Sequence, residues 1–260
     1  MYGAIIGDII GSVYEFAHPP IKTTEFDLFT PDSDYTDDTV LTCAVAEAIV
    51  NQWDFREALH RYGRNFPGRG YGGQFQSWLF TDPPIAYNSF GNGSAMRVSP
   101  VGFAYASLES VLREAKASAL PTHDHPEGIK GAQATAVAVF MASTGSTKQE
   151  IKQEIVSQFG YDLNRTVEEI RPVYQFNETC QETVPEAIIA FLESEDYESA
   201  VRLAISLGGD ADTLACITGG IAQAYYKVIP QWIQDRAWAI LPPPFKRVIG
   251  EFNDMFGVEV

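Results

Sequence analysis

The sequence has few cysteines and few basic residues, and both shortages exclude classes of protein. Its three cysteines, Cys43, Cys180 and Cys216, are odd in number and far apart, so they predict buried thiols in a reducing compartment rather than a disulfide framework. Lysine and arginine total 18 against 34 aspartates and glutamates, which gives a formal net charge of −16. Because such a charge repels nucleic acids and anionic lipids, direct nucleic-acid binding is disfavoured.

Long apolar runs and the common nucleotide and zinc motifs are also missing. No stretch approaches ~18 uncharged apolar residues, so the sequence predicts no membrane span. The first residues lack a basic region and carry Asp8 within their apolar run, which is unlike a signal peptide, and we expect a cytoplasmic protein. The patterns GxxxxGK[ST], CxxC and HExxH are absent, which argues against a phosphate loop of the GxxxxGK[ST] type and against zinc sites of these spacings.

The dominant pattern that is present is helical periodicity. No low-complexity linker divides the chain, so we expect a single domain over residues 1–260 with one sizeable core. Residues 40–53 are rich in alanine and apolar on most sides, which is typical of a central helix, and no segment alternates as a strand would. The sequence therefore predicts an all-α fold, a compact multi-helix bundle. Further helices are expected at residues 55–62, 108–119, 131–142, 148–159, 186–192, 200–207, 214–226 and 231–241.

Three stretches lack this periodicity, namely residues 31–38, 68–94 and 207–212. The second is rich in glycine and aromatic residues, and long loops in compact domains are usually functional. The other two lead into acidic clusters, TDD at residues 36–38 and DADT at residues 210–213, each just before an apolar helix. Capping of the helix explains one carboxylate in each cluster and leaves the second unexplained.

The paired clusters predict a metal site. If the two helix starts face each other, four carboxylates meet, and like charges ~4 Å apart repel by about 4 kcal/mol per pair at an effective dielectric constant of 20. Such a cluster must take up protons or hold a cation. Carboxylate and hydroxyl oxygens select hard divalent ions such as Mg²⁺ or Mn²⁺ over zinc. We therefore expect a binuclear metal site at the centre of the bundle.

The first residues form a glycine-striped segment. Gly3, Gly7 and Gly11 recur every four residues, and this smooth stripe predicts close packing of a first helix against another. Asp8 and Glu15 lie seven residues apart and thus on nearly the same face of that helix, two turns from each other. Glu15 is either a solvated residue or a general base that reaches into the site, and the spacing leaves both open.

Residues 88–97, NSFGNGSAMR, run from a loop into a short helix. Small residues with free backbone N–H groups before a helix can hold an anion such as phosphate, although GNGS alone favours a plain turn followed by a capped helix. Phe90, Tyr71 and Tyr87 offer rings that could stack on a nucleobase or sugar. Arg97 lies in an otherwise apolar stretch, and we expect it to pair with an acidic residue in the core.

Five short motifs occur in a fixed order along the chain. They are GDIIGSVYE at residues 7–15, TDDT at 36–39, GNGSAMRV at 91–98, TH at 122–123 and SLGGDADT at 206–213. This order resembles the ADP-ribosylglycohydrolases, the family of dinitrogenase reductase-activating glycohydrolase and the ADP-ribosylhydrolases. The resemblance runs from Gly3 to about Tyr226 and implies an all-α domain with two Mg²⁺ or Mn²⁺ ions at its centre.

The resemblance also implies roles for individual residues. Glu15 matches the family's mobile glutamate, which is proposed to gate the site or to act as base, and with Asp37 and Asp212 it is the expected catalytic set. The implied metal ligands are Thr36, Asp37, Asp38, Asp210, Asp212 and Thr213. The implied substrate-binding residues are Ser89, Phe90, Gly91, Asn92 and Gly93, which hold the diphosphate and ribose, and His123, which contacts ADP-ribose.

The implied activity is metal-dependent hydrolysis of the C1″ glycosidic bond, which releases ADP-ribose from an ADP-ribosylated protein or small-molecule conjugate. The acceptor stays open between arginine, serine, a nucleobase and a small ester. Asp82 is either a group that grips a guanidinium or a plain turn residue. Two alternatives also stay open: a catalytically silent ADP-ribose-binding protein, and a two-metal phosphoester hydrolase that acts on a nucleotide and releases AMP or phosphate.

Overall fold

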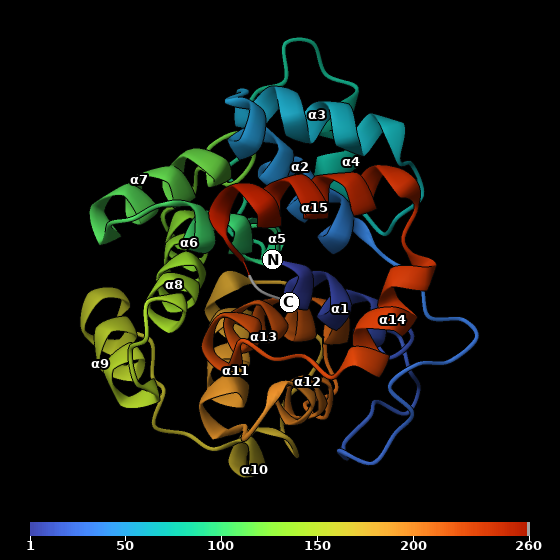
Figure 1. Cartoon of the computed structure of the whole chain (residues 1–260), viewed down its shortest axis with the longest axis vertical. Helices are drawn as coiled ribbons and strands as arrows, with labels where there is room; N and C mark the ends of the chain where they lie inside the picture. The colour runs from blue at the N-terminus through green and yellow to red at the C-terminus, as the bar shows by residue number, and fades with distance from the viewer. Residues whose placement is uncertain (259–260) are drawn as a thin grey trace.

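Two helices from opposite ends of the sequence, α1 and α13, lie against each other at the centre of the fold (Figure 1). The computed structural model describes residues 1–258, and within that range it contains helices, turns and one isolated bridge, between Gly91 and Thr179, but no strand. All of α1 and nearly all of α13 are buried. The helices are α1 (Tyr2–Gly11), α2 (Asp37–Asn51), α3 (Phe55–Asn65), α4 (Gly73–Leu79), α5 (Gly93–Met96), α6 (Ser99–Ala104), α7 (Leu108–Ala119), α8 (Pro126–Ser143), α9 (Lys148–Phe159), α10 (Val167–Ile170), α11 (Cys180–Glu193), α12 (Tyr197–Ile205), α13 (Ala211–Tyr226), α14 (Gln231–Ile240) and α15 (Pro243–Phe256).

The predicted all-α class is confirmed, and each predicted helix is present to within a few residues at most of its ends. Four helices were missed, namely the short helices α4, α6 and α10 and the longer helix α15. The segment 68–94, expected to be a loop throughout, contains α4, whose seven residues are too few to show a helical period. Pro243 ends the preceding helix as expected but also begins α15, because a proline at the first helical position loses no hydrogen bond.

The glycine stripe of α1 allows backbone-to-backbone contact with α13, as its spacing predicts. A Cβ atom added at Gly7 would lie 2.1 Å from the carbonyl oxygen of Ala215, and one at Gly3 would lie 2.5 Å from that of Gly219. At Gly11 the nearest atom would be the Cα of Asp212, at 2.4 Å. The contact therefore places the end of α1 directly beside the first turn of α13.

The substitution Gly7→Ala should destabilise the protein by about 3 kcal/mol or more, because the added methyl group overlaps backbone atoms that cannot rotate away. Gly250→Ala is the matched control, since no atom lies within 4 Å of the added Cβ in helix α15. That control should gain about 0.5–1 kcal/mol from alanine's higher helix propensity. Urea unfolding measures both changes, and a Gly7→Ala variant as stable as the wild type would disprove the close contact.

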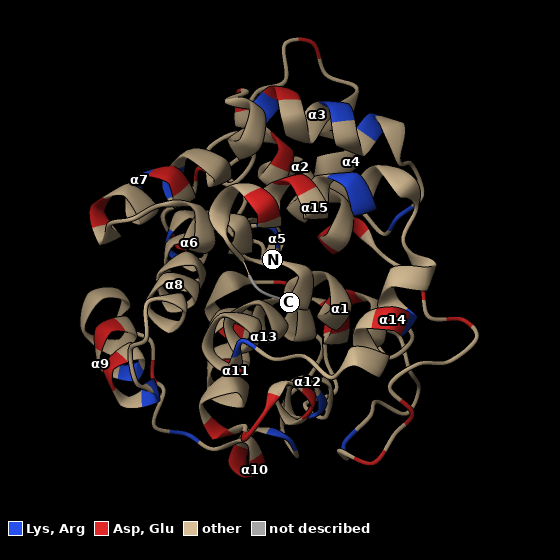
Figure 2. Ribbon diagram, viewed as in Figure 1, with Lys and Arg blue, Asp and Glu red and all other residues tan. Residues whose placement is uncertain are grey.

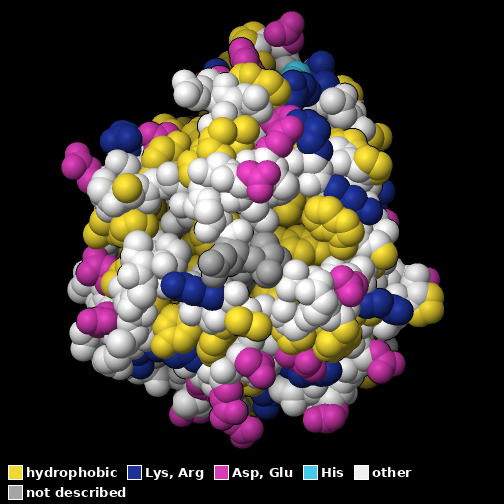
Figure 3. All heavy atoms as spheres, viewed as in Figure 1, with side chains coloured by type: hydrophobic (Ala, Val, Ile, Leu, Met, Phe, Trp, Pro, Cys, Tyr) yellow, Lys and Arg dark blue, Asp and Glu magenta, His cyan; other side chains and the backbone are white. Residues whose placement is uncertain are grey.

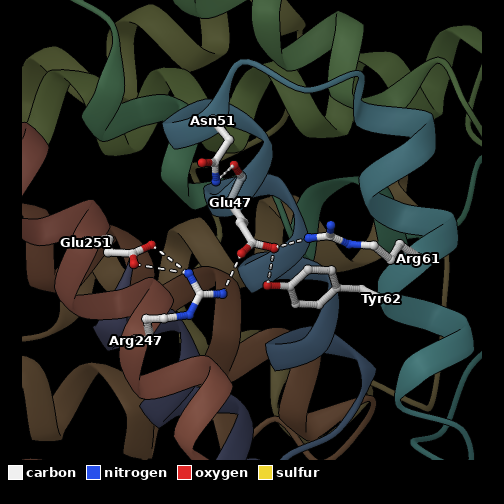
Figure 4. A network of polar contacts seen from close by, with 6 residues as sticks. All are labelled: Glu47, Asn51, Arg61, Tyr62, Arg247 and Glu251. Carbon is white, nitrogen blue, oxygen red and sulfur yellow. Dashed lines mark hydrogen bonds and ion pairs between the residues drawn. The ribbon is translucent and has the colours of Figure 1, made fainter.

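A buried carboxylate joins α2 to α3 and α15 (Figure 4). Glu47 is 3% exposed, and it accepts hydrogen bonds from Arg61 at 2.5 Å, Arg247 at 2.6 Å and the hydroxyl of Tyr62 at 2.9 Å. Burial alone raises the pKa of Glu47, but the hydrogen bonds from Arg247 and Tyr62 outweigh it and hold the pKa below its ordinary value. These bonds fix the C-terminal half of α2, whose other end carries the first acidic cluster.

Acidic side chains are spread over many helices and loops, and basic ones are scattered among them (Figure 2). On the face in Figure 3, basic and acidic groups alternate with hydrophobic ones and form no continuous basic stripe. The expectation against nucleic-acid binding stays a prediction. Among residues 1–258, no helix combines the length and the apolar character that crossing a membrane requires.

Candidate metal and ligand site

The two acidic clusters meet, and residues of both line a cleft of about 650 Å³. The first cluster begins α2 and the second begins α13, so the cleft lies where these two helix starts converge. Of the residues predicted for the site, Thr36 alone is not part of the lining. The predicted residues that line the cleft are Glu15, Asp37, Asp38, Ser89, Phe90, Gly91, Asn92, Gly93, His123, Asp210, Asp212 and Thr213.

Asp212 belongs to two groups of carboxylates at once. In one group it lies with Asp8 and Asp38, and in the other with Glu15 and Asp210. Within each group, one oxygen of every residue lies within 4.8 Å of the others. Two neighbouring positions that share one carboxylate are the arrangement a binuclear site requires.

The acidic cluster fits hard divalent cations. Asp38 is 2% exposed, and its Oδ1 has no hydrogen-bond donor among the residues that the structure describes, while its Oδ2 accepts a long bond of 3.3 Å from Thr213. A buried carboxylate oxygen without a partner is costly. Because every donor atom in the cluster is a carboxylate or hydroxyl oxygen, Mg²⁺ or Mn²⁺ would complete it.

The cluster binds protons unusually tightly when no cation neutralises it. Burial raises the pKa of Asp37, Asp38 and Asp212 well above the ordinary value, and neighbouring carboxylates add to this effect. Burial likewise raises the pKa of Asp8 to about 6 and, with the repulsion of nearby carboxylates, that of Glu15 to about 8. A cation that binds here must therefore displace protons, so its affinity rises with pH.

The metal-free protein is expected to lose stability as the pH rises from about 4 to about 8. In this window the folded state holds protons that the unfolded chain, with ordinary carboxyl pKa values near 4, has already released, so the free energy of unfolding falls with pH. Excess Mg²⁺ should raise the melting temperature more at about pH 8 than at about pH 5.

Melting curves in EDTA and in Mg²⁺ test this expectation. Asp38→Asn removes one of the protonating groups and should weaken the pH dependence in EDTA. Equal effects of Mg²⁺ at both pH values would contradict a metal site built from these carboxylates.

Asp8, to which the sequence assigned no role, holds the start of α2. Its Oδ1 accepts the hydroxyl of Thr36 at 2.6 Å, and its Oδ2 accepts the backbone N–H groups of Thr36 at 3.0 Å and Thr39 at 3.1 Å. The hydroxyl of Thr39 donates to Oδ2 as well, at 2.5 Å. With both oxygens engaged in these bonds, Asp8 orients Thr36 at the start of α2 and lies beside Asp38 and Asp212 in the first carboxylate group. The sequence signal for this role of Asp8 is a charged residue within an otherwise apolar, glycine-striped helix.

The local geometry differs from two expectations. The N-cap of α2 is Thr36, whose hydroxyl accepts the N–H of Asp38 at 3.3 Å, and the Asp210 side chain makes no cap bond at α13. Glu15 does not lie on the α1 helix, because that helix ends at Gly11 and Glu15 follows in a turn. The turn still brings its carboxylate to the cluster, beside Phe16, which is 78% exposed.

The predicted diphosphate loop is held against the segment before α11. The N–H of Asn92 donates to the carbonyl of Glu178 at 2.7 Å, and the N–H of Cys180 donates to the carbonyl of Phe90 at 3.0 Å. The Asn92 side chain, which is predicted to contact substrate, lines the cleft, donates to Asp210 Oδ2 at 2.6 Å and is 6% exposed. Asn92 therefore fixes a predicted metal ligand.

Arg97 does not pair with an acidic residue, contrary to expectation. It is fully buried, and its Nη2 donates to the carbonyl of Ser118 and the hydroxyl of Thr122, both at 2.9 Å. The carbonyl belongs to the last turn of α7, where helix carbonyls lack partners and carry partial negative charge. No carboxylate within residues 1–258 forms an ion pair with this guanidinium. Asp82, the candidate for gripping a guanidinium, is exposed and lies outside the cleft lining.

Sequence reasoning also missed Glu178, which lies in a segment without any motif. Its carboxylate lines the cleft, and burial and the charge of Asp210 raise its pKa. Nearby, Phe176 is 44% exposed and its ring stacks on that of Phe16 at a centroid distance of 5.8 Å. The cleft lining near Glu15 thus combines the Glu178 carboxylate with Phe176, whose ring stacks on the exposed ring of Phe16.

Comparison with known proteins agrees with the motifs. The profile of the ADP-ribosylglycohydrolase family matches residues 1–249, and the chain belongs to this family. The sequence is 29% identical to ADP-ribosylhydrolase ARH3 of Homo sapiens over 86% of this chain and 83% of that protein. It is 25% identical to ADP-ribosylarginine hydrolase Tri1 of Pseudomonas putida (strain GB-1) over 92% and 73% of the two chains. A solved structure described as an ADP-ribosylglycohydrolase-related protein complex has a TM-score of 0.76 and 25% identity, and covers 100% of this chain and 96% of its own.

Proposed function

We propose that this protein is a metal-dependent hydrolase that cleaves the C1″ glycosidic bond of ADP-ribosylated substrates, releases ADP-ribose and so reverses ADP-ribosylation. The observation that carries the proposal is the pair of carboxylate groups that share Asp212, together with the unpartnered oxygen of Asp38. Two Mg²⁺ or Mn²⁺ ions are the proposed cofactors. Their proposed ligands are Thr36, Asp37, Asp38, Asp210, Asp212 and Thr213.

The residues around the cluster suit the chemistry of glycosidic cleavage. When bound, divalent ions supply charge stabilisation and orientation to such a reaction. Glu15 adjoins the cluster, and its pKa of about 8 in the metal-free protein suits a group that holds or accepts a proton near neutral pH. Cleavage passes through an oxocarbenium-like transition state, and the ionised carboxylates of Asp37 and Asp212 would favour that positive charge.

The loop that contains Ser89, Phe90, Gly91, Asn92 and Gly93 is the proposed site for the diphosphate and ribose. Within residues 1–258, the backbone N–H groups of Phe90 and Gly93 have no protein acceptor and are available to an anion. His123 forms the adjoining wall, and the 45% exposed ring of Phe90 is positioned to contact the ligand. These donors and the bound cations supply local positive potential in an acidic protein.

The acceptor leaves on the side of Glu15 in this proposal. Glu178 has no ion-pair partner among the described residues, and it lies near the exposed rings of Phe16 and Phe176. A carboxylate beside aromatic rings suits a planar cation. Arginine is therefore the acceptor to test first, followed by serine, a nucleobase and a small ester. The modified partner is an ADP-ribosylated protein or a small-molecule conjugate.

Incubation with an arginine-ADP-ribosylated protein should release ADP-ribose in Mg²⁺ or Mn²⁺ and not in EDTA, as read by the mass of the product. Asp212→Asn should lower the rate by about 100-fold or more, because it weakens both cation positions at once. Asp82→Asn, a carboxylate removed outside the cleft, should leave the rate unchanged.

Three results separate the alternatives. If ADP-ribose is released only from an acceptor other than arginine, the proposed activity stands and the proposed acceptor changes. AMP or phosphate as the product would mean a two-metal phosphoester hydrolase. Binding of ADP-ribose without release from any acceptor would mean a catalytically silent binding protein. Either of the last two results contradicts the proposal.

A further inference from the structure

A chain of buried hydrogen bonds links Arg97 to His123 at the wall of the cleft. The Nη2 atom of Arg97 lies 2.9 Å from the hydroxyl oxygen of Thr122, and that oxygen lies 2.7 Å from Nδ1 of His123. Arg97 and Thr122 are fully buried and His123 is 5% exposed. Bulk water therefore has little access to the links of this chain, and the donors and acceptors must match one another.

The chemistry of arginine sets the direction of these bonds. A guanidinium has only donors, so Arg97 must donate to the hydroxyl oxygen of Thr122. The Thr122 hydroxyl can then donate its own proton, and Nδ1 of His123 lies within hydrogen-bond distance to accept it. An Nδ1 atom that accepts a bond carries no proton, so the neutral imidazole must carry its proton on Nε2.

The charges and titratable groups around His123 favour the neutral ring. Burial and the nearby charge of Arg97 hold the pKa of His123 well below its usual range. The ring of Tyr87 packs against His123, and its hydroxyl shares a hydrogen bond with that of Thr122. Burial raises the pKa of Tyr87 to about 12, so it stays a neutral phenol that can donate its own proton to the Thr122 oxygen and leave the Thr122 proton to His123. The carboxylate of the adjacent Asp124 accepts the backbone N–H of Asn88 at 2.7 Å.

The Nε2 edge of His123 faces the proposed diphosphate loop. A Cβ atom added at Gly93 would lie 3.3 Å from Nε2, and one at Gly91 would lie 3.6 Å from it. We infer that Arg97, acting through Thr122, is a positioning residue that holds His123 in the Nε2–H tautomer and presents a fixed hydrogen-bond donor to an oxygen of bound ADP-ribose. The tautomer is a property of the ligand-free protein, whereas its use in binding ADP-ribose rests on the proposed function.

Nuclear magnetic resonance of the full chain with ¹⁵N-labelled histidine reads the tautomer directly. The His123 signals, assigned by their loss in His123→Asn, should show a protonated Nε2 and an unprotonated Nδ1 near neutral pH. In Thr122→Val, which keeps the side-chain shape and removes the hydroxyl, these signals should shift toward a mixture of tautomers. Thr122→Ser, which keeps the hydroxyl, should retain the wild-type signals.

Titration with ADP-ribose tests whether the donor is used. The dissociation constant should rise about 3- to 10-fold in Thr122→Val, the effect of weakening one hydrogen bond, and stay near the wild-type value in Thr122→Ser. Tyr87→Phe should leave the tautomer unchanged.

Two results would overturn the inference. A protonated Nδ1 in the wild-type protein, or unchanged His123 signals in Thr122→Val, would disprove the role of Arg97 and Thr122 in setting the tautomer. The predicted tautomer with no change in affinity in Thr122→Val would disprove its use as a donor to the ligand. Because the tautomer is measured without substrate, these outcomes are distinct from a failure of hydrolysis.

Discussion

The backbone contact between α1 and α13 is the constraint on which the site depends. Since Gly7 and Gly11 leave no gap between these helices, α1 delivers Asp8 to the first turn of α13. Asp8 in turn binds the start of α2 through its bonds to Thr36 and Thr39. The two acidic helix starts are thereby forced together despite their charge, and the repulsion between them makes a cation or protons part of the folded state.

Periodicity and glycine spacing were sufficient to predict the helical class and the close packing of the first helix. They failed at α4, α6 and α10, which are too short to display a period, and at α15, whose prolines signal the end of one helix and the start of another equally well. The short helices thus lack a clear local signal, and α15 has a signal with two meanings. Only the packing of these segments on the rest of the protein decides between the meanings.

The candidate site was predictable where the motifs lie and unpredictable where distant segments meet. The acidic clusters at 36–38 and 210–213 stand out in the sequence because capping needs at most one side chain at each helix start, and each cluster carries two carboxylates. Glu178 and the surroundings of Arg97 do not, because their neighbours come from separate parts of the chain. Arg97 was expected to pair with a carboxylate, but its hydrogen-bond acceptors are a carbonyl of α7 and the hydroxyl of Thr122. No local sequence pattern predicts these neutral acceptors.

The central claim is that the carboxylates around Asp212 form a site for two cations. Electron paramagnetic resonance of the protein titrated with Mn²⁺ counts the bound ions and detects coupling between neighbours. The account predicts two Mn²⁺ ions per chain with magnetic coupling, and loss of the coupling in Asp212→Asn. A single uncoupled ion, or no tightly bound ion, in the wild-type protein would contradict it.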